Sequence, residues 1–202
     1  MLNRQQKTGY DCMMKRIVTL FVVALFVVAG IVSAPMVAQA DQNAPELNEL
    51  FEQLKSSTDY HDAAAIEQAI WKIWTVRGVA DVDKAMAYGI AAMNAGALRV
   101  SVLSFGRVIQ LAPDFAEGWN KRATVYYMMG RFDESVSDIQ RTLALEPRHF
   151  GALSGMGLIY DNLGKLSAAA KVWERALSIH PLMPGIRDRV DEIKSEAKGK
   201  PI

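Results

Sequence analysis

The sequence has a single cysteine and few histidines. Cys12 lies among the first 40 of the 202 residues. Residues 41–202 therefore have no disulfide, thiol nucleophile or thiolate metal site. His61, His149 and His180 lie far apart, and none is followed by a second ligand at i+3 or i+4, as zinc sites usually require. We predict no metal site and interpret the histidines as solvated loop residues.

An excess of charge of one sign is also missing. Lys and Arg together number 23, and Asp and Glu number 22; for residues 41–202 the two totals are 19 and 21. Proteins that bind nucleic acid by neutralising phosphates need a basic surface. We therefore expect no nucleic-acid partner.

Motifs for catalysis are incomplete. The stretch 151–165, GALSGMGLIYDNLGK, has glycines ahead of Gly-Lys, but a phosphate loop would need Gly at position 159 and Ser or Thr at 166, where Ile159 and Leu166 stand. A hydrolase elbow around Ser154 would need glycines at positions 152 and 156, which it lacks. We predict no catalytic residue, no cofactor and no enzyme activity.

Residues 1–40 have the three parts of a secretory signal. Lys15 and Arg16 precede the apolar stretch 17–32, and Ala38-Gln39-Ala40 follows as a cleavage triplet. We predict cleavage after Ala40 and export to the periplasm of a Gram-negative bacterium, where a domain without disulfides can persist. Met14 is an alternative translation start. The other alternative is an uncleaved inner-membrane anchor, because the apolar stretch is near the length that spans a bilayer.

Three prolines recur at a constant spacing of 34 residues, namely Pro113, Pro147 and Pro181. When residues 116–147 are aligned with 150–181, large apolar residues meet large ones, and small residues meet small ones. The matching pairs are Trp119 with Leu153, Ala123 with Gly157, Tyr126 with Tyr160, Gly130 with Gly164, Phe132 with Leu166, Ser135 with Ala169, Ile139 with Trp173 and Leu143 with Leu177. This period is typical of stacked helix-turn-helix repeats.

These columns resemble the tetratricopeptide repeat (TPR) family. The resemblance implies an all-α, TPR helix-turn-helix solenoid with units 82–115, 116–149 and 150–183, the first of which departs from the pattern at Ala85 and Ala92. We expect nine helices: two in residues 41–81, six in the repeats of residues 82–181, and one in residues 184–202. Both flanks are expected to cap the solenoid. Gly157 is predicted to allow close helix packing, and Gly164 to form a turn.

The resemblance also implies a concave groove, lined by the first helix of each pair, that holds a partner protein. The groove columns are Asp83, Met86, Ile90, Asn94, Glu117, Asn120, Thr124, Tyr127, Met128, Ser154, Leu158, Asp161 and Asn162. They lack the basic set with which some family members clamp a C-terminal carboxylate, so we predict no such recognition. Outside the repeats, Trp71 is a candidate partner-facing aromatic.

The predicted function is that of a periplasmic scaffold or adaptor that binds an unidentified envelope protein in this groove. The alternative is a membrane-tethered or self-associating structural component of the cell envelope. A fold alone does not specify a site, so a groove that only self-associates or is merely solvated also remains open.

Overall fold

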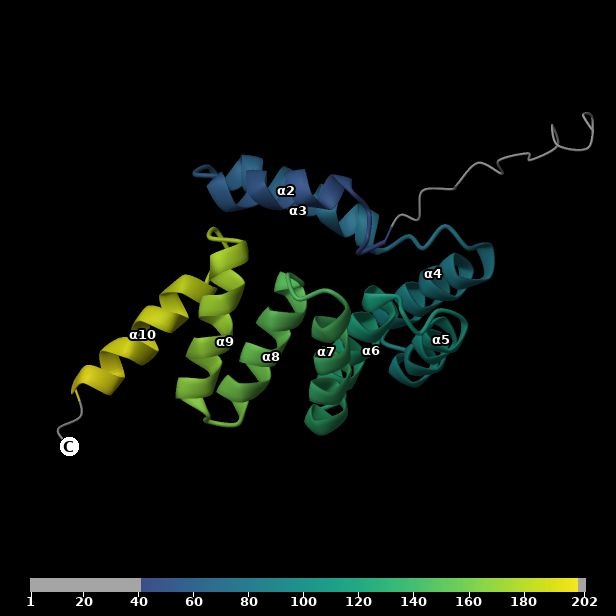
Figure 1. The fold of residues 1–202 in the computed structure, drawn as a ribbon. Helices are drawn as coiled ribbons and strands as arrows, with labels where there is room; N and C mark the ends of the chain where they lie inside the picture. The colour runs from purple at the N-terminus through teal and green to yellow at the C-terminus, as the bar shows by residue number, and fades with distance from the viewer. Residues whose placement is uncertain (1–40, 200–202) are drawn as a thin grey trace, which may run out of the picture. The chain divides into compact units, whose positions relative to one another are not determined.

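The computed structural model describes residues 41–199 (Figure 1). The predicted signal segment and cleavage triplet therefore lie outside the described residues. Every helix of the described part belongs to one compact unit. Within the described part, no helix is long and apolar enough to cross a bilayer.

Nine α-helices build residues 41–199, which confirms the predicted all-α class and helix number for this part of the chain. They are α2 (Glu46–Ser56), α3 (Tyr60–Trp74), α4 (Ala80–Asn94), α5 (Leu98–Leu111), α6 (Ala116–Met128), α7 (Phe132–Leu145), α8 (Phe150–Asn162), α9 (Leu166–Ile179) and α10 (Ile186–Gly199).

The six central helices form the pairs α4–α5, α6–α7 and α8–α9, each joined by a short turn (Figure 1). The second helix of a pair packs on the first helix of the next, so α5 contacts α6 and α7 contacts α8. At the C-terminal end α10 lies on α9, where Val190 and Ile193 bury their side chains against Trp173. This is the arrangement of a stacked helical repeat.

Two glycines of the last pair have the roles that the repeat register predicts. A Cβ atom on Gly157 would lie 2.2 Å from Nε1 of Trp173, so only glycine lets α9 approach α8 this closely. Gly164 has φ +68°, and Gly130 has φ +72° at the same position of the preceding pair. This left-handed backbone conformation ends the first helix of each pair, and it is favourable only for glycine.

The N-terminal helices do not cap the first repeat, contrary to our expectation. Phe51, Ile70 and Trp74 instead share a core with Phe150 at the start of α8, and Leu182 after α9 packs against the same core. Helix α2 contacts α9 directly. The apolar side chains of α2 and α3 thus have their partners at the last pair, so these helices pack there and not on α4 and α5.

Polar contacts hold both ends of the N-terminal pair. Asp41 and Asp114 both form ion pairs with the buried Arg77. The Gln42 amide donates to the Asp114 carbonyl at 2.6 Å and accepts from the backbone N–H of Ala116 at 3.2 Å. These bonds attach both the beginning of the described chain and the segment after α3 to the loop that leads into α6.

Candidate functional site

A pocket of about 480 Å³ lies between α3 and the first helices of the last two repeats. We call it the α3–α8 pocket. It is lined from α3 by Glu67 and Trp71, and it extends to Met183 after α9. Six of the predicted groove residues line it, namely Asn120, Thr124, Tyr127, Met128, Ser154 and Leu158. The repeat register thus brings the groove columns of two successive repeats to one hollow surface.

The remaining predicted groove residues lie elsewhere. Ile90 is half-buried beside the core of the first pair, and Asn94 is exposed near the C-terminal end of α4. Asp161 pairs with Arg189 of α10, with an oxygen-to-nitrogen distance of 2.8 Å. Asn162 is exposed and donates to the Tyr127 hydroxyl at 3.2 Å, which places it next to the pocket without lining it.

Met86 is a correction to the predicted groove. Its side chain is only 1% exposed, and it packs with Val82 and Phe105 in the core of the first pair. Asp83, another residue of the predicted set, accepts hydrogen bonds from the backbone N–H groups of Arg77 and Gly78. These two side chains therefore serve the packing of the first repeat and the start of α4.

Glu117 is the second correction, because it is a buried acid. Its carboxylate lies 3.0 Å from Nζ of Lys121 and 2.9 Å from Nε2 of His149. Nδ1 of His149 accepts from the backbone N–H of Ala152, so the ring proton lies on Nε2 and is donated to Glu117. The first turn of α6 therefore faces the start of α8 and not a partner.

The histidines of the repeat loops are buried, which corrects the prediction that they are solvated. His149 and His180 are 0% and 2% exposed. His149 stacks on the Trp74 ring with centroids 4.1 Å apart, and Nε2 of His180 lies 3.3 Å from a Glu67 oxygen. The packing of α3 across the starts and ends of the later repeats buries both rings.

The pKa of Glu117 depends on its burial and on two of its partners, Lys121 and His149. Burial raises the pKa of Glu117, whereas the Lys121 ammonium and the hydrogen bond with His149 lower it, and the net pKa lies below the usual value. Folding therefore favours the ionised form. The stabilisation is fully present above the unfolded pKa of about 4.5 and is lost as pH falls through the lower folded pKa.

We accordingly expect the free energy of unfolding to fall with pH below about 4.5 and expect Glu117→Gln to flatten this dependence. Urea unfolding at a series of pH values between about 7 and 3 measures it. Glu196→Gln, on the exposed side of α10, is the matched control and should keep the wild-type slope. An equal slope in all three proteins would show that Glu117 does not carry the acid sensitivity.

Trp71 forms one wall of the pocket. Its indole N–H donates to a Glu67 oxygen at 3.0 Å, and the Lys121 ammonium lies 5.0 Å from the ring centroid. A Cβ atom on Gly151 would come within 2.7 Å of the Trp71 ring. The absence of a side chain at Gly151 lets α3 lie directly on the first turn of α8, and both Trp71 and Gly151 line the pocket.

The pocket wall is largely apolar and carries one acidic group. Phe150, Ile139 and Met183 add to the apolar lining, while Asn120 and Ser154 supply polar atoms. Glu67 is the one residue charged at neutral pH among those that line the pocket. Such a surface suits an apolar side chain flanked by hydrogen-bonding groups.

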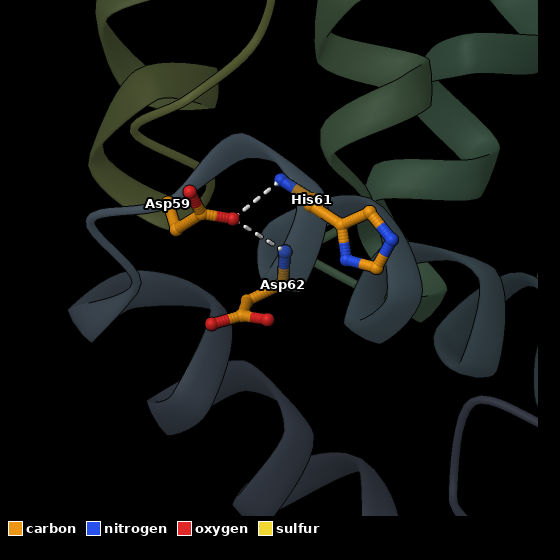
Figure 2. A group of neighbouring side chains, drawn as sticks. All are labelled: Asp59, His61 and Asp62. Carbon is orange, nitrogen blue, oxygen red and sulfur yellow. Dashed lines mark hydrogen bonds between the residues drawn. The ribbon is translucent and has the colours of Figure 1, made fainter.

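A second group of polar residues lies at the start of α3 (Figure 2). The ligand-type atoms of Asp59, His61 and Asp62 lie within 4.8 Å of one another, and all three residues are exposed. One Asp59 carboxylate oxygen accepts from the backbone N–H groups of His61 and Asp62, as Figure 2 shows. Asp59 therefore acts as the N-cap of α3, and the cluster is explained by this role.

Sequence reasoning missed the contribution of α3 to this site. The repeat alignment compares each residue with those 34 positions away, and α3 precedes the first unit. The contacts of Trp71 with Gly151 and of Glu67 with His180 join segments far apart in the chain. The one available signal was Trp71 itself, a large aromatic residue beside the apolar stripe of α3.

Comparison with known proteins agrees with the fold. The tetratricopeptide repeat profile matches residues 116–149. A TPR repeat-containing protein of Rhizobium etli is 37% identical over 153 residues, which are 76% of this chain and 75% of the relative. The chain therefore belongs to the tetratricopeptide repeat family.

Solved TPR domains have the same fold at low sequence identity. The first TPR of Spaghetti (RPAP3), solved with the HSP90 peptide SRMEEVD, superposes with a TM-score of 0.56 at 20% identity over 59% of this chain and 94% of that one. The Sgt2 TPR domain of Aspergillus fumigatus gives 0.55 at 17% identity over 61% and 87%. These similarities concern the fold of the repeats.

Proposed function

We propose that this protein is an exported, non-enzymatic scaffold or adaptor that binds a segment of another envelope protein in the α3–α8 pocket. The observation that carries the proposal is the convergence of α3, α6 and α8 on one apolar pocket with a polar rim. TPR proteins with solved structures support it, since one of them is described as bound to a peptide. A preformed pocket loses little conformational entropy on binding.

The chemistry of the wall defines the kind of segment. Leu158 and Met128 are 41% and 50% exposed, so an apolar side chain of the partner can bury them. The Glu67 carboxylate, which already accepts from Trp71 and contacts His180, still makes the wall negative and so disfavours an acidic residue next to that side chain. Lys121 already pairs with Glu117 and so does not provide a free cation for a carboxylate. An acidic peptide such as SRMEEVD is therefore a poor match for this pocket.

We expect Leu158→Glu to abolish or strongly reduce partner capture. The change places a charge on the apolar rim and next to the Glu67 wall, where it must be desolvated on binding. The measurement is a pull-down from a periplasmic extract with the full chain, with bound proteins identified and quantified by mass spectrometry. We expect at least about a tenfold loss, the size of one truncated binding hot spot.

Leu163→Glu is the matched control. Leu163 is 47% exposed, lies after α8 and does not line the pocket. Proteins that bind in the pocket should be retained by this variant and lost from Leu158→Glu. A partner retained equally by both variants binds another surface, and that result would reject the pocket as the binding site.

Export is part of the proposal and has its own test. The signal pattern of residues 1–40, with the Ala38-Gln39-Ala40 triplet, supports it. Cell fractionation with mass measurement should give a soluble periplasmic product that begins with Asp41. A product that keeps residues 17–32 in the membrane fraction would establish the tethered alternative instead.

A further inference from the structure

The outer side of the first repeat is an exposed face with mixed chemistry. Asp81, Lys84 and Tyr88 of α4 and Arg107 and Leu111 of α5 line a shallow hollow of about 350 Å³. Leu103 precedes Arg107 by one helical turn and lies on the same stripe of α5. We call the surface formed by these six residues the first-repeat end face.

The repeat register shows that the side of α4 that carries Asp81, Lys84 and Tyr88 corresponds to the side of α6 and α8 that packs on the preceding repeat. Val125 of α6 packs into the core of the α4–α5 pair, and Ile159 of α8 packs into the core of the α6–α7 pair. Both are fully buried. Ala91 has the same position on α4, 34 residues before Val125, and it is exposed. Within residues 41–199, no preceding repeat covers the stacking side of the first pair, because α2 and α3 pack on the last pair.

Two large apolar side chains of this face are exposed beside its charged residues. Tyr88 is 63% exposed, and Leu103 is 75% exposed. Ser137 and Lys171 occupy the position of Leu103 in the next two repeats, so the outer surface of later second helices is polar at this place. Large exposed apolar side chains that gather on one surface mark an interaction site.

The opposite end of the solenoid has a different surface. Val190 and Ile193 of α10 are buried against α9, and the outward positions of α10 are charged residues such as Arg187, Asp191 and Glu192. A head-to-tail arrangement would place the exposed Tyr88 and Leu103 side chains of the first-repeat end face against this charged helix. The two ends are therefore not complementary, which disfavours an open chain of copies.

We propose that the first-repeat end face is the interface of a two-fold dimer of this chain. The face carries Asp81 together with Lys84 and Arg107, so an identical face turned by 180° offers charges of the opposite sign. Tyr88 and Leu103 supply the apolar surface that such a contact buries. No residue of this face lines the α3–α8 pocket, so the proposal is independent of the proposed function.

Sedimentation velocity on the full chain, purified in the form that accumulates in the cell, tests the dimer. We expect a concentration-dependent monomer–dimer equilibrium on the order of 1 to 100 µM. Leu103→Glu should raise the dimer dissociation constant at least about tenfold. It should leave the thermal melt of the monomer unchanged, because the side chain is largely exposed.

Leu163→Glu is the control, since it adds the same charge at an exposed leucine outside the first-repeat end face. This variant should dimerise like the wild type. A protein that stays monomeric across the whole concentration range would overturn the proposal. So would a dimer that survives Leu103→Glu, or one that Leu163→Glu disrupts to the same extent.

Discussion

Gly157→Leu should unfold the protein or destabilise it by more than about 3 kcal/mol, at or beyond the upper end of the cost of overpacking a core. A Cβ atom at this position would lie 2.2 Å from Nε1 of Trp173, and leucine adds three more carbon atoms. Trp173 is 2% exposed and donates its indole N–H to the Ser154 carbonyl at 3.2 Å. The ring cannot move away without breaking this bond and the packing of α10.

The control for this variant is Lys165→Ala in the same stretch of sequence. Lys165 is exposed at the start of α9, and its side chain makes no capping hydrogen bond. Its loss should change the free energy of unfolding by less than about 0.5 kcal/mol. Thermal melts followed by circular dichroism compare the two variants. The reverse order of stabilities would contradict the repeat packing and favour a phosphate loop in residues 151–165.

Trp74→Ala should cost about 3–5 kcal/mol, the usual range for removing a buried tryptophan. The ring is 1% exposed, stacks on His149, and lies 5.3 Å from the Phe150 ring and 5.8 Å from the Phe51 ring, measured between centroids. It is a central side chain of the core that joins α2 and α3 to the last repeat. Hydrogen exchange should show the largest loss of protection in α2 and α3, with less change in α6 and α7.

Trp74→Phe separates the effect of the ring from that of its polar atom. The Trp74 indole N–H is buried and has no hydrogen-bond partner among residues 41–199. Phenylalanine keeps an aromatic ring on His149 and removes the unpaired donor, so the cost should stay below about 1.5 kcal/mol. If alanine and phenylalanine cost the same, or if protection is lost first in α6 and α7, Trp74 is not the link between the two parts.

The repeat architecture could be predicted from the sequence because its contacts are local. The repeat helices pack mainly within their own pair or on a neighbouring pair, so Gly157 and Gly164 show their roles in the spacing alone. Six groove residues were placed on one surface by the same argument. Met86 and Glu117 were not, because their columns turn toward a core or a neighbouring loop in this chain.

The N-terminal helices could not be placed from the sequence. Their periodicity predicts two amphipathic helices, but an apolar stripe does not specify which surface it covers. The N-terminal helices pack on the last repeat because Trp74 stacks on His149 and Trp71 packs against Gly151. Such contacts follow from the shape of the assembled repeats. The same packing leaves the first-repeat end face exposed and makes Glu67 and Trp71 part of the pocket wall.

Site-specific photo-crosslinking in living cells tests the central claim most directly. A photoreactive aromatic residue replaces Leu158, at the rim of the α3–α8 pocket, or Leu163, which is similarly exposed and lies outside it. We predict that the residue at position 158 forms an adduct with another envelope protein and that the residue at position 163 forms little or none. Equal adducts at the two positions, or none at position 158, would contradict the account.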